Sequence, residues 1–334
     1  MKKTNIAVVG LGGIAQLVHL PILSKLNSVN IVAVSEVNKN RLKTVGNKFN
    51  VSNQYSDYKK MLAENDIDAV IIATPTKSHL EVSLEAINAG KHILIEKPIA
   101  VNYEEAKKIN DAAKKAKVKA MVGMNFRFRP DAMLLKSMIN GSELGDLFYI
   151  RCGWSRKQSS EEKWFRKKTE SGGGVLIDLG IMLLDLGIWF LDYPPVKSVS
   201  VQTYSHKVKG VEDSAVGFLR FKNGSVINFE VSWSLHSEKD SFNLTAFGTE
   251  GTGHLNPFRA YKRVDSARID YTPTGSASTK NLYKKSYENE LKHFISSIRG
   301  NTPFLSSSEE AVTRMKLLEA IYESAKKEKE IILK

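Results

Sequence analysis

Short apolar runs alternate with longer amphipathic segments through the first 122 residues of the chain. The runs at 6–9, 31–34 and 68–73 are almost wholly apolar, which is typical of strands covered on both faces of a sheet. Further strands are predicted at 92–96 and 119–124. Helical spacing of apolar residues predicts helices at 14–26, 39–49, 58–64, 76–89 and 103–115. This alternation predicts a parallel, doubly wound sheet.

The pattern changes after residue 122. Helices are predicted at 131–139 and 175–191 and a strand at 148–154. Strand-like period-two runs follow at 196–206, 214–221, 225–234 and 242–247, with a hairpin turn at Asn223-Gly224. We therefore predict two domains, 1–122 and 123–334. The second is expected to be α/β with a large, mainly antiparallel open sheet, an irregular segment at 256–282 and closing helices at 287–299 and 308–326.

A glycine-rich segment follows the first predicted strand where a helix begins. Residues 10–15 read G-x-G-x-x-A, a dinucleotide-binding fingerprint when it joins a strand to a helix. Gly10 permits the tight turn, Gly12 lets the backbone approach a pyrophosphate, and Ala15 lets the helix pack closely. The helix N-terminus would hold the pyrophosphate. The predicted cradle comprises Gly10, Gly12, Gly13, Ile14 and Ala15.

An acidic side chain at the end of the second strand bears on the choice of cofactor. Glu36 lies about twenty residues beyond the fingerprint, where a carboxylate accepts hydrogen bonds from ribose hydroxyls. It would repel the extra phosphate of NADP, and Val37 adds no positive charge, although Lys39 and Arg41 could partly compensate. The sequence favours NAD over NADP. The alternative interpretation of Glu36 is a solvated strand end.

Composition is that of a globular protein with an excess of positive charge. The chain has 334 residues, with 49 Lys and Arg against 36 Asp and Glu, and a formal net charge of +13. The lysines are dispersed and no nucleic-acid-binding module appears, so we expect a solvated surface and no nucleic-acid partner. The apolar stretch 175–193 is interrupted by Asp178, Asp185 and Asp192, which predicts a buried helix rather than a membrane span.

Thiol and metal chemistry have little support in the sequence. Cys152 is the only cysteine, which excludes an intrachain disulfide and a cysteine-based metal site and fits a reducing cytoplasm. No cluster of His, Cys, Asp and Glu has metal-ligand spacing, so no metal is predicted. The first strand begins almost at once, which leaves no room for a signal peptide. We expect a cytoplasmic protein.

A second candidate site lies at the end of the predicted strand 92–96. Glu96-Lys97-Pro98 stands where parallel sheets bind ligands, outside the carboxyl ends of their strands. A lysine there can donate a hydrogen bond to a substrate oxygen and, if it gives up its charge, can move a proton. The alternative is a surface lysine held by a proline turn. These residues alone do not decide between the two.

Together these motifs resemble the Gfo/Idh/MocA oxidoreductase family over nearly the whole chain. The N-terminal matches are the glycine loop, Glu36, Ala73-Thr74-Pro75-Thr76-Lys77-Ser78-His79 and Glu96-Lys97-Pro98. The later matches are Phe126-Arg127-Phe128, Trp164 ahead of Gly172-Gly173-Gly174, Asp178-Leu179-Gly180, Phe247-Gly248-Thr249-Glu250-Gly251 and the segment 320–325. The resemblance implies an NAD(P)-dependent dehydrogenase of sugars, polyols or related hydroxy compounds. It also implies a Rossmann domain followed by an α/β domain whose open sheet packs in a homodimer or homotetramer.

The resemblance implies cofactor-binding roles for residues at the strand ends. Thr74, Pro75 and His79 would line the cofactor groove, with Glu96 near the nicotinamide ribose. Lys97 would also belong to the cofactor-binding residues, since the Lys97–Pro98 region would shape the nicotinamide pocket. Asn125, at the crossover between the domains, would complete the cofactor contacts. For His79 the alternative role is packing at a helix terminus.

Catalytic and substrate roles are implied in the same way. Lys97 would polarise the reacting oxygen, and Asp178 would position the substrate or tune Lys97. Arg127 and Trp164 would contact the substrate. Their alternatives are a link between the two domains for Arg127 and a surface loop for Trp164.

The chain departs from the family at one position of the substrate site. The family pattern D-x-G-x-H-x-x-D reads here Asp178-Leu179-Gly180-Ile181-Met182-Leu183-Leu184-Asp185. Positions i and i+4 share a helix face, so the residue at 182 is expected to meet the same substrate as Asp178. The histidine usual there would accept the hydroxyl proton. Met182 can neither bind nor release one.

Three interpretations of this departure stay open. In the first, Lys97 takes the acid/base role with help from another group, for which His236, Lys163 and Tyr204 are distant candidates. In the second, the substrate needs no histidine. In the third, the protein is a degenerate, cofactor-dependent binding or regulatory module. Loss of a general base typically costs about 10²–10⁴-fold in rate, so residual activity is compatible with methionine. We predict an active NAD-dependent dehydrogenase that moves a hydride between nicotinamide and a hydroxyl-bearing carbon.

Overall fold

The chain folds into two compact units. The computed structural model describes residues 2–157, 162–233, 239–265, 267–273 and 281–333. One unit comprises Met1–Asn125 with Tyr287–Thr313, and the other comprises Phe126–Ser286 with Arg314–Lys334. The sequence predicts a boundary at 122 and places both closing helices in the second domain. Most of α9 (Leu282–Ile298) and the start of α10 (Ser308–Lys327) instead belong to the first unit, because an apolar helix pattern does not specify which core the helix packs against.

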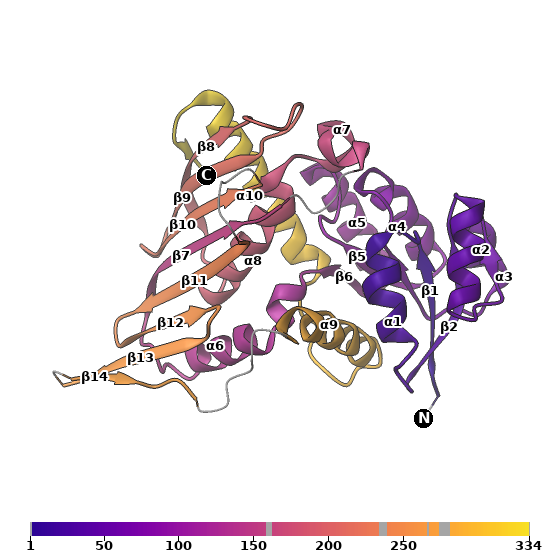
Figure 1. Cartoon of the computed structure of the whole chain (residues 1–334), viewed down its shortest axis with the longest axis horizontal. Coiled ribbons are helices and arrows are strands. Elements are labelled where there is room, and N and C mark those ends of the chain that lie inside the picture. Colours follow the sequence, from indigo (N-terminus) through magenta and orange to yellow (C-terminus); the bar gives the residue numbers. More distant parts are fainter. Residues whose placement is uncertain (1, 158–161, 234–238, 266, 274–280, 334) are drawn as a thin grey trace. The chain divides into compact units, whose positions relative to one another are not determined.

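The first unit is built on a six-stranded sheet (Figure 1). The strands are β1 (Thr4–Val9), β2 (Val29–Ser35), β3 (Gln54–Tyr55), β4 (Ala69–Ile72), β5 (His92–Glu96) and β6 (Ala120–Gly123). Their order is β3-β2-β1-β4-β5-β6, and every neighbouring pair is parallel. The order reverses between β1 and β4, so the ligand crevice of such a sheet lies at the carboxyl ends of these two strands. The predicted doubly wound sheet is confirmed.

Helices connect the strands of this unit. They are α1 (Leu20–Leu23), α2 (Lys39–Lys48), α3 (Tyr58–Glu64), α4 (His79–Asn88) and α5 (Tyr103–Ala116). The first begins with a π-helical turn, Ala15–His19, which continues directly into α1. Asn38, Asp57 and Asn102 start three of the others, because their side chains accept hydrogen bonds from backbone N–H groups of the first turn.

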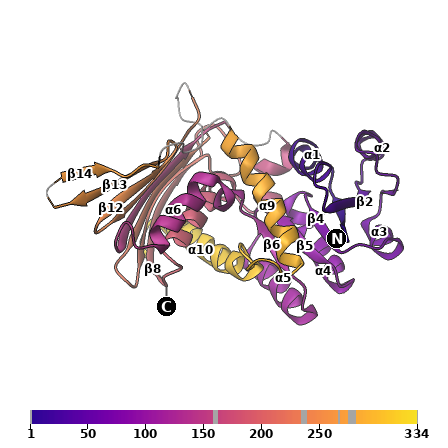
Figure 2. The ribbon, with the colours of Figure 1, turned by 90° about the horizontal axis from the view of Figure 1, so that it is seen from below.

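The second unit is built on a nine-stranded sheet (Figures 1 and 2). The strands are β7 (Leu147–Ser155), β8 (Val196–Tyr204), β9 (Ser214–Phe221), β10 (Val226–Ser232), β11 (Ser241–Gly248), β12 (Gly251–Leu255), β13 (Arg259–Val264), β14 (Ala267–Asp270) and β15 (Ile331–Ile332). Their order is β14-β13-β12-β11-β7-β10-β9-β8-β15. The β7–β10 pair is parallel and the other pairs are antiparallel. The predicted, mainly antiparallel sheet is confirmed, whereas the expectation of an irregular segment over 256–282 missed β13 and β14.

Helices cover one face of this sheet (Figure 2). They are α6 (Pro130–Asn140), α8 (Ile181–Phe190) and the part of α10 that belongs to this unit. A π-helical turn, Leu176–Gly180, leads into α8, and every residue of α8 is buried. The helical stretch Lys168–Phe190 is apolar and long enough to cross a membrane by composition, but its apolar window lies wholly inside the protein.

Candidate functional site

The glycine loop is shaped by its contact with the end of β4. Gly10 has a φ of 88°, and a Cβ there would lie 2.7 Å from the carbonyl carbon and oxygen of Ala73. Only glycine suits both the left-handed backbone and this close approach. A Cβ on Gly12 or Gly13 would meet nothing within 4 Å. The loop therefore keeps an open side at its second and third glycines, which fits the space that a pyrophosphate needs.

Ile14 and Ala15 form the start of the helix that follows. Ile14 precedes the π-helical turn, Ala15 is its first residue, and Ala15 is fully buried. The absence of a larger side chain at Ala15 lets the turn pack closely, as the fingerprint predicts. This places a helix N-terminus directly behind the glycine loop, the arrangement that favours an anionic group.

Glu36 is a buried anchor rather than a solvated strand end. The residue is 7% exposed, and its carboxylate accepts hydrogen bonds of 2.9 Å from the backbone N–H groups of Leu11 and Asn38. Arg41 lies 3.4 Å from the same carboxylate. Glu36 thus holds the glycine loop against the end of β2, and it forms an ion pair with Arg41.

His79 joins the two loops that end β4 and β5. Its ring nitrogens lie 2.9 Å from the carbonyl oxygens of Thr74 and Pro98. Burial lowers the pKa of His79, while both carbonyls favour its protonated form. Pro75 is exposed beside Thr74, and the Thr74 hydroxyl is buried with no hydrogen-bond partner among the described residues. His79 thus shapes the predicted cofactor groove from within.

Glu96 and Lys97 stand at the carboxyl end of β5. Glu96 accepts a 2.7 Å hydrogen bond from His19 and a 3.3 Å bond from the backbone N–H of Lys97. Burial alone would raise the pKa of Glu96, but the bond and charge of His19, with the charge of Lys97, hold this pKa below its ordinary value. Lys97 is half-buried and precedes a cis peptide bond to Pro98. The strand end therefore fixes the backbone from which Lys97 projects.

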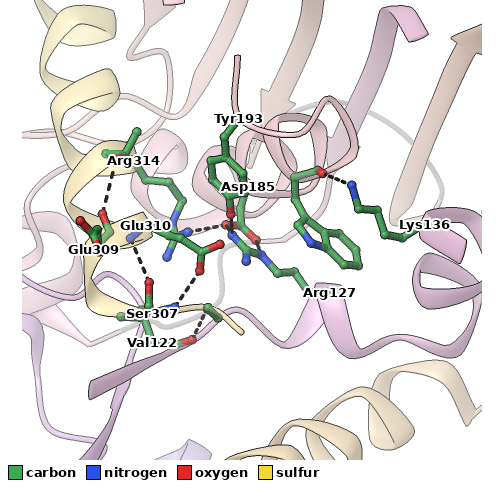
Figure 3. A network of polar contacts seen from close by, with 12 residues as sticks. Val122, Arg127, Lys136, Asp185, Tyr193, Ser307, Glu309, Glu310 and Arg314 are labelled. Atoms are coloured by element: carbon green, nitrogen blue, oxygen red, sulfur yellow. Dashed lines mark hydrogen bonds and ion pairs between the residues drawn. The ribbon is translucent and has the colours of Figure 1, made fainter. Parts of the chain in front are cut away.

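Asn125 and Arg127 follow β6 in a short 3-10 turn, Asn125–Phe128. Both are buried, and Arg127 is fully so. Its guanidinium makes a two-pronged ion pair with Asp185, at 2.7 and 2.6 Å, and contacts the Tyr193 hydroxyl. Arg314 approaches the same carboxylate at 2.7 Å, as Figure 3 shows. A guanidinium buried against Asp185 is an internal anchor of the second unit, and the substrate role of Arg127 stays a prediction.

Asp178 lies in the π-helical turn that the sequence treats as ordinary helix. It is 2% exposed, and its carboxylate accepts a 3.0 Å hydrogen bond from the indole N–H of Trp233. Met182, four residues on, is also 2% exposed. A π-helical turn is often found at functional sites. The structure therefore gives Asp178 a partner, Trp233, that the sequence analysis missed, although its place at the end of the period-two run 225–234 was a signal.

Trp164 belongs to an aromatic cluster beside this carboxylate. The turn Lys163–Arg166 carries Trp164 and Phe165, whose rings meet edge to face at 5.3 Å. Phe165 in turn lies 5.7 Å from Trp233. Tyr204 lies in β8 and is 41% exposed, and Lys163 is exposed. His236 lies outside the described residues.

Glu212 is a second residue that the sequence analysis missed. Its carboxylate accepts hydrogen bonds from the backbone N–H groups of Gly174 and Leu176, at 2.9 and 3.0 Å, and from the Tyr322 hydroxyl at 2.9 Å. Burial raises the pKa of Glu212 despite these bonds. A Cβ on Gly174 would lie 2.0 Å from the carbonyl oxygen of Glu212. Glu212 therefore ties the glycine triplet to the turn that carries Asp178.

The structure gathers the predicted site residues into two groups, one in each unit. In the first unit, the carboxyl ends of the parallel strands carry the glycine loop and the predicted residues Glu36, Thr74, His79, Glu96 and Lys97. In the second unit, Asp178 lies in the π-helical turn and Met182 lies at the start of α8. Trp164 belongs to the adjacent aromatic cluster. Among the described residues no group of three or more His, Cys, Asp and Glu could hold a metal ion.

Comparisons with known protein families match both parts of the chain. A model described as an oxidoreductase family with an NAD-binding Rossmann fold matches residues 4–124. A model described as the C-terminal alpha/beta domain of the same oxidoreductase family matches residues 136–333.

Individual relatives are similar along nearly their full lengths. D-glucoside 3-dehydrogenase of Escherichia coli (strain K12) is 26% identical over 96% of this chain and 95% of its own. The scyllo-inositol 2-dehydrogenase (NAD(+)) of Bacillus subtilis (strain 168) is 27% identical over 91% of this chain and 89% of its own. The solved structure of a levoglucosan dehydrogenase with NADH and L-sorbose has the same fold, with a TM-score of 0.91, 23% identity and 100% coverage of both chains. These names are those of dehydrogenases, so the comparisons lend no support to the degenerate alternative.

Proposed function

The chain belongs to the Gfo/Idh/MocA oxidoreductase family, and from this premise we propose that it is an NAD-dependent dehydrogenase of a sugar, polyol or related hydroxy compound. The reaction is the transfer of a hydride between nicotinamide and a hydroxyl-bearing carbon. The observation that carries the proposal is Lys97 at the carboxyl end of β5, in the unit that holds the glycine loop. The names of the glucoside and inositol relatives support the substrate class.

We propose NAD rather than NADP as the cofactor. When bound, NAD supplies the carbon that accepts hydride. Glu36 is the residue that would hold the adenosine ribose hydroxyls, and its buried carboxylate would repel a phosphate there. Arg41 is paired with Glu36, and the neighbouring Val37 is 84% exposed and uncharged. Gly12, Gly13 and the following helix N-terminus would hold the pyrophosphate.

The choice of cofactor is tested at Glu36. Replacing Glu36 with Ala is expected to weaken NAD binding about tenfold to a hundredfold, because charge-assisted hydrogen bonds to the ribose are worth about 1.5–3 kcal/mol. Discrimination against NADP should relax in the same variant, as measured by calorimetric titration with each nucleotide. Tighter binding of NADP than NAD by the wild-type protein would overturn the assignment.

In the proposed reaction the chain's own residues handle the hydroxyl group. Once Lys97 has given up its own ammonium proton to solvent, its neutral amine accepts the hydroxyl proton as hydride leaves, a role that Met182 cannot fill. Asp178 accepts a hydrogen bond from the substrate and orients it. Thr74, His79 and Glu96 keep the strand-end loops in place around the cofactor.

The direct test is nicotinamide reduction, followed by absorbance, with NAD and a panel of sugars, polyols and sugar acids. Lys97→Met serves as the control, because it keeps most of the length of the side chain and removes the amine. We expect turnover by the wild-type protein that is lost in this variant. NAD binding without turnover of any compound would favour the degenerate alternative.

We also propose that the protein is a cytoplasmic homodimer or homotetramer that associates through the uncovered face of the second sheet. Tyr204 and Val216 are 41% and 45% exposed, and Tyr149 stacks on Phe247 at 4.9 Å. Light scattering should show an oligomer that Val216→Lys dissociates. Met133→Lys, on the exposed side of α6, should leave it intact. A monomeric wild-type protein would contradict the proposal.

A further inference from the structure

The carboxylate of Asp178 is held by a side chain from the end of a neighbouring strand. Trp233 follows β10 directly, and its indole N–H donates to Asp178 Oδ2 at 3.0 Å. Asp178 is 2% exposed, so this hydrogen bond forms where water is scarce. A hydrogen bond to a buried ionised group is worth more than one at the surface.

The indole is fixed from both its backbone and its ring. The backbone N–H of Trp233 donates to the carbonyl oxygen of Asp213 at 2.8 Å. The ring of Trp233 lies 5.7 Å from that of Phe165 at an interplanar angle of 35°, and Phe165 meets Trp164 edge to face. The N–H therefore points at the carboxylate from a side chain that has little freedom to turn away.

We propose that Trp233 is a positioning residue for Asp178, which it holds at one carboxylate oxygen in the orientation that receives the substrate hydroxyl. The inference rests on the proposed function. Its chemical logic is that an indole N–H is a donor only and does not ionise near neutral pH. Such a partner fixes the direction of the carboxylate throughout turnover.

The presence of methionine at position 182, where the family pattern has histidine, makes the positioning of Asp178 by Trp233 more important. In the family pattern a histidine shares the helix face of Asp178 and can orient the same hydroxyl. Met182 has no polar hydrogen and no strong acceptor. The second unit then orients the substrate through Asp178, and Trp233 holds one oxygen of that carboxylate.

The first test examines the hydrogen bond itself in the protein without substrate. The chain has 4 tryptophans, so a spectrum of 15N-labelled indole groups contains few signals, and Trp233→Phe assigns one of them. Asp178→Asn is expected to move that signal and to leave the other three in place. A Trp233 signal unmoved by Asp178→Asn would overturn the inference.

The second test measures turnover of NAD with whichever of levoglucosan, scyllo-inositol and methyl β-D-glucoside the wild-type protein oxidises best. Trp233→Phe keeps an aromatic ring and removes the N–H, so we expect kcat to fall about tenfold to a hundredfold with little change in NAD affinity. Trp154→Phe is the matched control, since Trp154 lies in the adjacent strand β7 and stacks on Phe126 at 4.7 Å.

A double-mutant cycle separates this inference from the proposed function. In an Asp178→Asn background, Trp233→Phe is expected to cost little further activity, because the two residues act as a unit. Full activity of Trp233→Phe beside a crippled Asp178→Asn variant would overturn the inference alone. Full activity of Asp178→Asn would contradict the proposed function and the inference together.

Discussion

Glu96 illustrates how one carboxylate organises the residues around a strand end. Its two oxygens accept hydrogen bonds from His19, on the helix behind the glycine loop, and from the backbone of Lys97. The carboxylate therefore links the predicted pyrophosphate cradle to the predicted catalytic lysine within the first unit. Its pKa is depressed because the bond from His19 and the neighbouring positive charges outweigh the effect of burial.

The depressed pKa of Glu96 predicts a pH-dependent contribution to stability. A carboxyl group whose folded-state pKa is lowered stabilises the fold above the ordinary value of 4.5, and the contribution is lost as pH falls through the lower folded value. Glu96→Gln should therefore lower the free energy of unfolding by about 1.5–3 kcal/mol between about pH 5 and 8, and by less in stronger acid. Denaturant titrations over this range test it, with the exposed Glu64→Gln as the control. Equal stability of the wild type and Glu96→Gln at pH 7 would contradict the prediction.

A histidine in place of Met182 is expected to raise kcat. Met182→His places a proton-accepting ring four residues from Asp178, so we expect kcat to rise about tenfold above pH 7, part of the range typical of general base catalysis. The buried polar ring should lower the free energy of unfolding by about 1–3 kcal/mol. Met182→Leu controls for the change in shape. A kcat that stays at the wild-type value in Met182→His, at equal NAD affinity, would show that no base is missing.

At the scale of elements, most helices and strands could be predicted from apolar periodicity. The strand 92–96 matches β5, and the helix 103–115 differs from α5 by one residue. The pattern failed in β13 and β14, where charged residues interrupt the alternation and all residues of β14 are exposed. It also missed the two π-helical turns at Ala15–His19 and Leu176–Gly180, because a wider turn barely alters the spacing of apolar residues. The role of Glu212 could not be predicted from the sequence, because it depends on a contact with the distant segment around Gly174 and Leu176.

Glu212 is expected to stabilise the element that carries Asp178. Glu212→Ala leaves two backbone N–H groups and the Tyr322 hydroxyl without their acceptor, so the free energy of unfolding should fall by about 3 kcal/mol. Activity should fall as well, because the Asp178 N–H bonds the carbonyl oxygen of Gly174 in the same turn. Glu212→Gln keeps an acceptor and should retain most of both. Chemical denaturation would refute this role if the Ala variant were as stable as the Gln variant.

Across the whole molecule, more of the site residues could be predicted from the sequence in the first unit than in the second. Its cofactor residues follow rules of local order, since a glycine turn, a strand end and a helix start are adjacent in the chain. The residues around Asp178 come instead from β10, from the turn at 163–166 and from the π-helical turn, so only the fold brings them together. The ion pair of Arg127 with Asp185 could not be predicted for the same reason, because the two residues are distant in the sequence.

We propose above all that this chain moves a hydride with Lys97 as its proton-handling group. The most direct measurement is the transfer of deuterium to nicotinamide from a substrate labelled at the oxidised carbon. We expect label in the reduced nicotinamide, and we expect Lys97→Met to slow its appearance by about 10²–10⁴-fold while NAD affinity stays unchanged. Unlabelled nicotinamide, or transfer by Lys97→Met at the wild-type rate, would contradict the account.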